Sequence, residues 1–404
     1  MKVLLHVKAR LGQALSIAVA ASCLGVPNFS ALAAEAQPEA VSRALDVQPL
    51  QPSEYQMLKH RKLLFATSRK ISQNAQSAAR SKAGGSYRYE DVFQETISPS
   101  IAYGWVEVGF PSDREFGAQN YNDDPANPNP FKYFSIEAYG VVGTRQSARE
   151  LATAQGYDPT QRAFVFVHGI NNSFSDAAER LTQLVVDLNV KGVPLLFSWP
   201  SETGAPVIRV TPGAYIRVLS HARASEQYFA QAIDDVLGSH EYTFDLLAHS
   251  MGTLVAFDVL SSRPSKDVRS LDPVAPAAHV LPNVVLAAPD IGMNYFTLRR
   301  DEFIRKSQRL TIYCGPDRAL NFSKDVNGEE RLGYCQEPKQ QKDYIDGVEF
   351  VRLYGNFRDF WRHSYYLNSP QVLSDLKNAL SMGSEVPASL PASHPPYREI
   401  LLNN

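Results

Sequence analysis

The sequence predicts an α/β protein whose mainly parallel sheet has eight strands and is flanked by helices. Short apolar runs of strand length alternate with amphipathic runs of helix length, which is the pattern of consecutive βα units. The run at 163–168 is apolar nearly throughout, as expected for a strand covered on both faces. The chain has 404 residues, 44% of them hydrophobic, so it is long enough to bury a large core without metal or disulfide support.

The regular part of the pattern begins near residue 63. A capping-box pair, Ser173 and Asp176, marks the start of a helix over 173–190. The polar stretch 71–98 contains two adjacent glycines and is expected to be a loop. The expected strands are 63–67, 101–108, 163–168, 193–197, 242–248, 284–288 and 310–314, with one more within 344–353.

The N-terminus has the pattern of a secretory signal peptide over residues 1–33. A basic start precedes the apolar segment 15–26, and the small residues Ala31 and Ala33 form a cleavage pattern. We therefore expect an exported protein, either periplasmic or secreted. Two alternatives remain: a buried N-terminal helix, and lipid attachment at Cys23, where the preceding residues match a lipobox poorly.

The rest of the chain divides into three expected parts. Residues 34–60 are polar and without clear periodicity and predict a linker, and residues 61–383 form one α/β domain. Residues 384–404 contain several prolines and are expected to be a tail outside the core. After removal of a signal peptide only Cys314 and Cys335 remain. In an oxidising compartment they form either one disulfide or two buried thiols.

Composition and missing motifs exclude several classes of function. The 40 basic and 42 acidic side chains nearly balance, which gives no electrostatic reason to expect nucleic acid or an anionic membrane as partner. Neither glycine-rich nucleotide-binding motif occurs, and no Cys-x-x-Cys pair or Cys/His cluster predicts a structural zinc. We expect no cofactor, no metal and no transmembrane segment in the mature chain.

A serine nucleophile is the sharpest prediction of the sequence. An apolar strand leads directly into Ser250, and a helix pattern follows it. At such a turn the hydroxyl projects from the sheet, and the residues two positions away must be small. Ala248 and Gly252 meet that requirement, although glycine is usual at the first position.

A serine hydroxyl needs a base, and the base needs an orienting acid. His363 follows the last expected strand, where the base belongs, whereas His279 comes too early and His394 lies in the tail. Two acids stay open, each after a strand: Asp317, which the strand order favours, and Asp290. A third option, Asp346, is weaker.

The oxyanion of an acyl-transfer intermediate requires two backbone N–H donors. One is expected from Met251, which follows the nucleophile, and the other from Ile170 in the turn after the third strand. We expect Gly169 to let the backbone turn there and Asn171 to brace that turn. The adjacent His168 is interpreted as a packing residue and not as a catalyst.

These residues resemble the α/β-hydrolase superfamily, and more narrowly the bacterial serine esterase-like family DUF900. The order and spacing of the similar segments extend over about residues 60–380. Two features have no place in that pattern: the polar segment 71–98 and the cysteine before Asp317. The segments that carry the resemblance are Phe65–Arg69, Val167–Asn171 with Ser173 and Phe174, Phe197–Pro200, Ala248–Gly252, Ala288–Asp290, Asp317–Leu320 and His363–Tyr366.

The resemblance implies hydrolysis of carboxylic esters, with Ser250, Asp317 and His363 as the triad, and it does not supply a substrate. We expect the partner to be a small-molecule acyl ester. The alternatives within enzymes are lysophospholipase and thioesterase activity, which differ in pocket shape and leaving group. Outside enzymes, the alternative is a catalytically silent envelope protein that uses the same fold for binding.

Overall fold

The structure, a computed structural model, describes the parts of the chain that form the sheet, its helices and the adjoining turns. All of them belong to one compact unit, Glu39–Asn404. The expected signal peptide, with Cys23, lies outside the described residues. The described residues are 41–44, 58–72, 92–119, 131–142, 148–158, 161–203, 210–237, 244–262, 281–337, 345–380 and 397–403.

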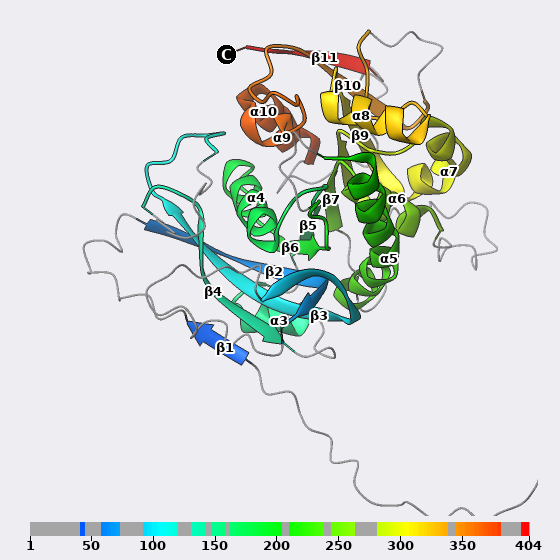
Figure 1. Cartoon of the computed structure of the whole chain (residues 1–404). Helices are drawn as coiled ribbons and strands as arrows, with labels where there is room; N and C mark the ends of the chain where they lie inside the picture. Colours follow the sequence, from blue (N-terminus) through cyan, green and yellow to red (C-terminus); the bar gives the residue numbers. More distant parts are fainter. Residues whose placement is uncertain are drawn as a thin grey trace, which may run out of the picture. The chain divides into compact units, whose positions relative to one another are not determined.

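A single sheet of eleven strands organises these residues (Figure 1). Its order is β1-β4-β3-β2-β6-β5-β7-β8-β9-β10-β11. The eight strands from β2 to β11 in this order pair in parallel, whereas β1, β4, β3 and β2 pair antiparallel. The strands are β1 (Val41–Ala44), β2 (Leu58–Ile71), β3 (Phe93–Pro111), β4 (Ser135–Val142), β5 (Ala163–Val167), β6 (Val193–Ser198), β7 (Phe244–His249), β8 (Leu281–Ala287), β9 (Ser307–Cys314), β10 (Val348–Gly355) and β11 (Tyr397–Leu402).

All eight expected strands are present, but the expected total was wrong because three more strands pair at the two sides of the sheet. Strand β1 lies inside the range expected to be a linker, and β2 begins at Leu58. Strand β11 lies inside the expected tail and pairs in parallel with β10, and its Leu402 is buried. Strand β3 begins at Phe93, within the stretch expected to be a loop.

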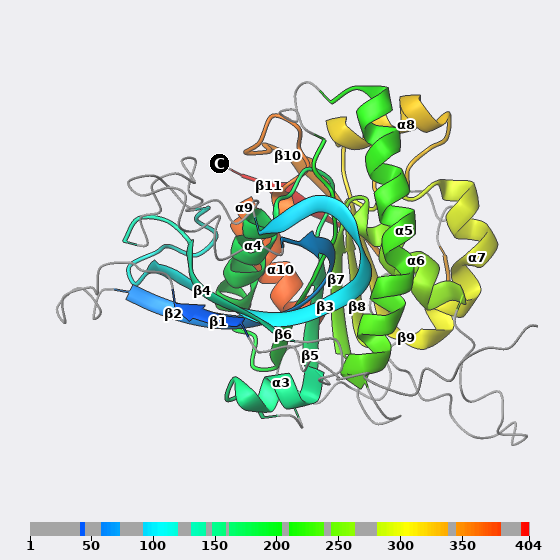
Figure 2. The same cartoon turned by 60° about the horizontal axis from the view of Figure 1, so that its bottom comes forward.

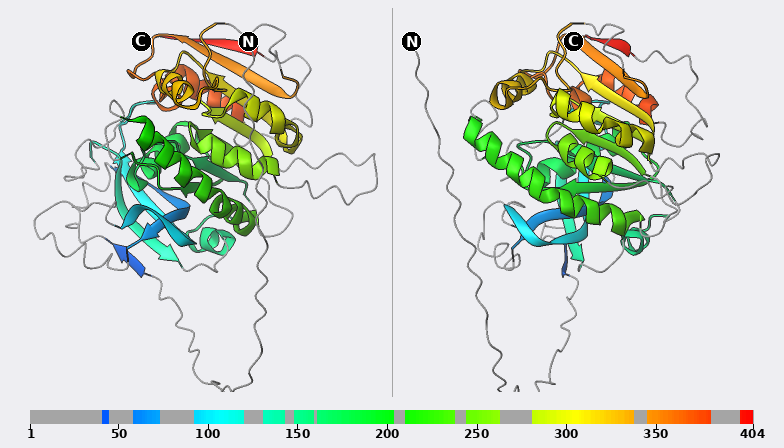
Figure 3. Two further views of the ribbon diagram at one scale, coloured as in Figure 1. Left: turned by 45° about the vertical axis from the view of Figure 1, so that its right-hand side comes forward. Right: turned by 90° about the vertical axis from the view of Figure 1, so that its right-hand side faces the viewer.

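Helices cover both faces of the sheet (Figure 2). Helices α4, α9 and α10 pack on one face, and α5, α6 and α7 pack on the other. The longest described helix, α5, runs beside α6 (Figure 3). The helices are α3 (Ala148–Ala154), α4 (Phe174–Asp187), α5 (Pro212–Leu237), α6 (Gly252–Ser262), α7 (Met293–Lys306), α8 (Arg318–Asn327), α9 (Tyr365–Asn368) and α10 (Pro370–Leu380).

The two-faced sheet explains why its central strands are apolar at every position. In β5, Phe164 and Phe166 enter the core under α4, while Val165 and Val167 enter the core under α5 and α6. Successive side chains of a strand point to opposite faces, so both sets must be apolar when both faces are covered. The expected capping box of α4 is confirmed, with Ser173 and Asp176 bonded reciprocally.

The parallel strands bring their carboxyl ends to one edge of the sheet, and the predicted site residues follow these ends. Ser250 follows β7, and His168 follows β5. Asp317 follows β9, and His363 lies in the segment between β10 and α9. Within the described residues, no helix has the length and apolar character required to cross a bilayer.

Candidate active site

Ser250 occupies a strained turn between β7 and α6. Its backbone φ is 53°, in the left-handed region that a serine rarely adopts. The turn is held on both sides: the Ser250 N–H donates to the Ala287 carbonyl at 3.0 Å, and the Ser250 carbonyl accepts from the Thr253 and Asp290 N–H groups. A strained position that is held this firmly is typical of a functional site.

The turn requires small neighbours, as the sequence predicted. A Cβ on Gly252 would lie 2.2 Å from the His168 carbonyl oxygen, and one on Gly169 would lie 2.7 Å from Ser250 Cβ. Gly169, which we expected to let the backbone turn, is not among the described glycines with a positive φ. Close approach to Ser250 is what requires glycine there, and the residue with a left-handed backbone is Asn171, with φ 59°.

His363 and Asp317 form a buried pair. The ring Nδ1 of His363 lies 2.5 Å from Asp317 Oδ2, and the Asp317 side chain is fully buried. The other carboxylate oxygen of Asp317 accepts from the N–H groups of Ala319 and Leu320 and caps α8. The helix cap therefore fixes the carboxylate that orients the imidazole.

The second ring nitrogen of His363, Nε2, is buried and has no hydrogen-bond partner among the described residues. The residue before the serine, His249, brings this ring close to the Ser250 turn. Its Nε2 donates to the His363 carbonyl at 3.0 Å, and the centroids of the two rings are 4.6 Å apart. His363 and Asp317 are thus joined directly, and His249 links His363 to the turn that carries Ser250.

The charges around His363 favour its protonated form. Burial lowers the pKa of the ring, but the charge and hydrogen bond of Asp317, with the charges of Asp359 and Asp290, outweigh burial. The pKa of His363 is therefore raised above the ordinary value of 6.5. A base with this environment accepts a proton readily.

Asp290, the other candidate acid, has different partners. It forms a buried ion pair with Arg331, whose Nε lies 2.7 Å from Oδ1. The Tyr215 and Ser323 hydroxyls donate to the same carboxylate at 2.8 and 2.5 Å. No hydrogen bond joins Asp290 to His363 within the described structure, so the geometry favours Asp317 as the acid.

The turn after β5 leaves a backbone donor free. Among the described residues, the N–H groups of Ile170 and Met251 donate to no acceptor. Asn171 braces the turn as expected, since its Oδ1 accepts from the Thr203 hydroxyl at 2.9 Å. One free donor directly follows Ser250, and the other lies on the turn after β5, where Gly169 closely approaches Ser250.

His168 is hydrogen-bonded through both ring nitrogens at this turn. Its Nδ1 donates to the Gly169 carbonyl at 2.9 Å, and its Nε2 accepts from the Trp199 N–H at 3.1 Å. Burial, with the charge of Arg69, holds its pKa well below the usual range. Both ring nitrogens are occupied and the ring stays neutral, so it has no free nitrogen for catalysis.

The two cysteines of the domain form a disulfide, which resolves the alternative left open by the sequence. Cys314 and Cys335 are bonded, with their Cα atoms 5.6 Å apart. Cys314 ends β9, three residues before Asp317. The segment 331–335 also hydrogen-bonds to Gly315, so it supports the loop that carries the acid.

Sequence reasoning missed two side chains near the nucleophile. His249 was passed over because a residue inside the serine motif gives no separate signal, although its position next to Ser250 places it against the base. Asn172 was overlooked beside Asn171. Its amide donates to the carbonyls of both Gly169 and Ile170, at 3.1 and 2.9 Å.

Comparison with known families agrees with this architecture. Residues 145–380 match the family described as "Alpha/beta hydrolase of unknown function (DUF900)". This range covers more than half of the chain and includes Ser250, Asp317 and His363. The chain belongs to the DUF900 family of α/β hydrolases. The resemblance at Phe65–Arg69 lies before the matched range of this DUF900 protein, and no curated protein matches the chain.

Solved structures that resemble this DUF900 chain include known hydrolases at low identity. Phospholipase PlaB from Legionella pneumophila is 16% identical over 51% of this chain and 41% of its own, with a TM-score of 0.24. An acetyl xylan esterase is 12% identical over 55% and 99%, with a TM-score of 0.28. Esterase B from Lactobacillus rhamnosis is 12% identical over 81% and 80%, with a TM-score of 0.25. The chain thus spans less than half the length of the phospholipase.

Proposed function

We propose that this α/β hydrolase is a carboxylic ester hydrolase that acts through Ser250, His363 and Asp317. One observation carries the proposal: His363 bonds a buried carboxylate through Nδ1 and keeps a buried, partnerless Nε2 beside a strained serine turn. A ring with one nitrogen held by an acid and the other free is what a general base requires. Membership of a hydrolase family adds support.

In the proposed mechanism, Ser250 Oγ attacks the ester carbonyl while His363 Nε2 takes the hydroxyl proton. Asp317 holds the ring in the tautomer that leaves Nε2 unprotonated and stabilises the imidazolium that forms. The imidazolium then gives the proton to the leaving alcohol, and an acyl-enzyme remains. Water, deprotonated by His363, attacks the acyl group and releases the acid and the free serine.

The proposed oxyanion hole consists of the N–H groups of Ile170 and Met251. Neither donates to an acceptor within the described part of the chain, and they lie on the two turns that meet at Ser250. Loss of one such donor costs about 2.7–4 kcal/mol of transition-state stabilisation in hydrolases of this kind. An unused pair of donors at a nucleophile therefore supports acyl transfer.

The proposed substrate is a small acyl ester, and the proposed location is outside the cytoplasm. The disulfide Cys314–Cys335 supports export, since such bonds persist in oxidising compartments. A chain-length series of p-nitrophenyl esters, the matching thioesters and lysophosphatidylcholine tests the substrate class. If kcat/KM were larger on thioesters or on lysophosphatidylcholine than on the simple esters, the protein would instead be assigned as a thioesterase or a lysophospholipase.

The nucleophile is tested by intact mass after exposure to a fluorophosphonate. We expect one adduct on the wild type and on Ser262→Ala, an exposed position at the end of α6, and none on Ser250→Ala. Circular dichroism shows whether each variant is folded. An unlabelled but folded wild type would contradict the mechanism and favour a binding protein with the same fold.

A further inference from the structure

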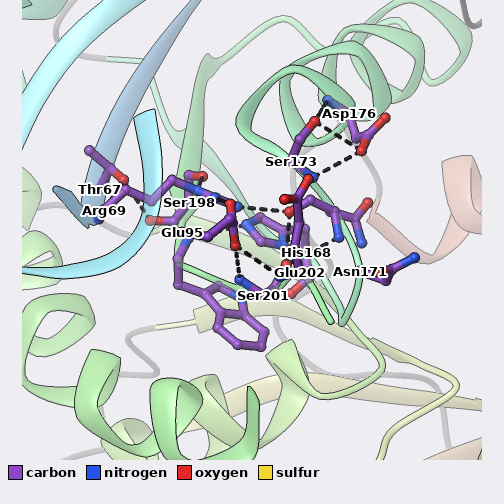
Figure 4. Close-up of polar contacts among 12 residues, drawn as sticks. Thr67, Arg69, Glu95, His168, Asn171, Ser173, Asp176, Ser198, Ser201 and Glu202 are labelled. Atoms are coloured by element: carbon purple, nitrogen blue, oxygen red, sulfur yellow. Dashed lines mark hydrogen bonds and ion pairs between the residues drawn. The ribbon is translucent and has the colours of Figure 1, made fainter. Parts of the chain in front are cut away.

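A buried polar network lies behind the turn that supplies the Ile170 N–H (Figure 4). It includes Arg69 at the end of β2 and Glu95 near the start of β3, neither of which touches the triad. The Arg69 side chain is fully buried and forms an ion pair with Glu95. A buried ion pair is a weak source of stability, because desolvation offsets the attraction between the charges, so this one calls for another explanation.

The peptide between Gly169 and Ile170 is held through its carbonyl. The Gly169 oxygen accepts from His168 Nδ1 at 2.9 Å and from the Asn172 side chain at 3.1 Å. In a trans peptide the N–H points opposite to the C=O. Two bonds to the carbonyl therefore fix the direction of the Ile170 N–H, the proposed oxyanion donor.

Arg69 holds the residue that makes one of those bonds. Its Nη2 donates to the Asn172 carbonyl and its Nε donates to the Ser198 hydroxyl, both at 2.8 Å. These contacts join the end of β2 to the turn after β5 and to the end of β6. A guanidinium presents several donors in a rigid plane, so one side chain fixes acceptors from different segments at once.

Glu95 holds the opposite side of the same turn. One of its carboxylate oxygens accepts from the N–H groups of Ser201 and Glu202, each at 2.9 Å. Ser201 in turn bonds the turn at three points: its hydroxyl donates to the Asn172 carbonyl at 2.8 Å and accepts from the Asn172 N–H at 3.1 Å, and its carbonyl accepts from the Asn171 N–H at 2.7 Å. Figure 4 shows these bonds converging on the turn from the β2 and β3 side.

We propose that Arg69 and Glu95 are positioning residues for the oxyanion hole. They act through Asn172 and Ser201, and they set the direction of the Ile170 N–H without contacting substrate. This inference rests on the proposed ester hydrolysis and adds to it a requirement for a charged pair on the neighbouring strands. Loss of the Arg69–Glu95 pair weakens binding of the tetrahedral oxyanion and leaves binding of the planar ester unchanged.

The test compares Arg69→Lys with Arg114→Lys. Arg114 forms a second buried ion pair with Asp187, and the two side chains are 3% and 2% exposed. Arg114 does not touch the turn. Lysine keeps the charge and loses the planar set of donors in both variants. The measurements are kcat and KM on a p-nitrophenyl ester, and the inhibition constant of a trifluoromethyl ketone, which forms a tetrahedral adduct.

We expect Arg69→Lys to lower kcat about 10- to 100-fold, since a slightly misplaced donor loses much of its effect on the transition state. The inhibition constant of the ketone rises by a similar factor, while KM is unchanged. Arg114→Lys lowers the stability to urea and leaves kcat, KM and the inhibition constant unchanged. If Arg69→Lys does not fold, Glu95→Gln, which keeps an acceptor oxygen, takes its place. We then expect a smaller fall in kcat and a smaller rise in the inhibition constant, again with KM unchanged.

Equal kinetic effects of Arg69→Lys and Arg114→Lys on an active wild type would overturn this inference alone. A parallel rise of KM and of the ketone constant would do the same, because it indicates general damage to the site. A wild type without ester turnover or fluorophosphonate adduct would instead overturn the proposed function. The two failures are therefore distinguishable.

Discussion

Two neighbouring loops at the carboxyl edge of the sheet carry a buried aspartate each and use it differently. The loop after β8 carries Asp290, whose carboxylate faces Arg331 and two hydroxyl groups. The loop after β9 carries Asp317, whose carboxylate faces two backbone N–H groups and the imidazole of His363. Both side chains are 3% exposed or less.

The difference teaches that burial after a strand does not by itself identify a catalytic acid. Arg331 is a fixed positive charge bonded to the Asp290 carboxylate, and within the described structure no hydrogen bond joins Asp290 to a histidine. Asp317 has no arginine or lysine bonded to it within the described structure, and its partner is a group that gains and loses a proton. In the proposed mechanism, the carboxylate that orients the base is the one whose counter-charge, the imidazolium, forms during the reaction.

The largest effect that separates the two loops is on turnover. Asp317→Asn removes the charge that stabilises the imidazolium and favours the wrong ring tautomer, so we expect kcat to fall about 10³- to 10⁴-fold. Ester hydrolysis at saturating substrate measures it, with thermal unfolding to confirm an intact fold.

Asp290→Asn is the matched control, with the same change of chemistry one strand away. It leaves the Arg331 charge buried without its carboxylate, so we expect the free energy of unfolding to fall by about 3–5 kcal/mol, with a smaller effect on kcat. A larger loss of kcat in Asp290→Asn than in Asp317→Asn would reassign the acid and reverse the comparison.

The next effect concerns what the two loops share. The segment 331–335 bonds Ile291 and Pro289 in the first loop and Gly315 in the second, and the disulfide Cys314–Cys335 anchors it. Replacing both cysteines by serine removes a cross-link that closes a loop of 21 residues. We expect a loss of about 3 kcal/mol in unfolding free energy, since the unfolded chain gains freedom, with kcat unchanged below the new transition.

Urea unfolding with and without a reducing agent measures this loss, because the reduced wild type must match the double serine variant. An unchanged midpoint in both cases would show that the cross-link adds no stability. A large loss of kcat in the folded variant would show that the disulfide also positions Asp317.

The sequence predicts structure well where neighbouring residues determine it, or where both faces of a strand have the same apolar environment. Central strands such as β5 are apolar on both faces, and the Ser250 turn is specified by its immediate neighbours, so both were predictable. The strands β1, β4 and β11 were missed because their signal is weak. In β4, buried and half-buried residues come in pairs and not in alternation, and β11 is half-exposed or exposed except at Leu402 and follows a proline-rich stretch.

The network behind the oxyanion turn was not predictable for a different reason. Arg69 is 103 residues from Asn172, and Glu95 is 106 residues from Ser201, so no local spacing links them. Asp290 and Asp317 show the same limit, since strand order favoured one acid but only the positions of Arg331 and His363 separate the two.

The smallest effect is on the pH dependence of the base. In the proposed mechanism, His363 must be neutral to accept the serine proton, so activity is lost as pH falls through its pKa. Asp317, Asp359 and Asp290 raise that pKa against the effect of burial. We therefore expect the acidic limb of kcat/KM to have its midpoint above 6.5.

Asp359→Asn removes one of these charges. The asparagine oxygen can still accept from the His363 backbone N–H, 3.0 Å away, and only the two 3.3 Å bonds from Ser364 and Asn368 to the other oxygen are lost. The lost negative charge makes protonation of the ring less favourable, so the midpoint moves to lower pH by a fraction of a unit. The rate of fluorophosphonate labelling between pH 5 and 9 gives the same midpoint without a turnover assay. A wild-type midpoint at or below 6.5, or one that does not move in Asp359→Asn, would mean that burial outweighs the carboxylates around the base, and His363 would then resemble the neutral His168.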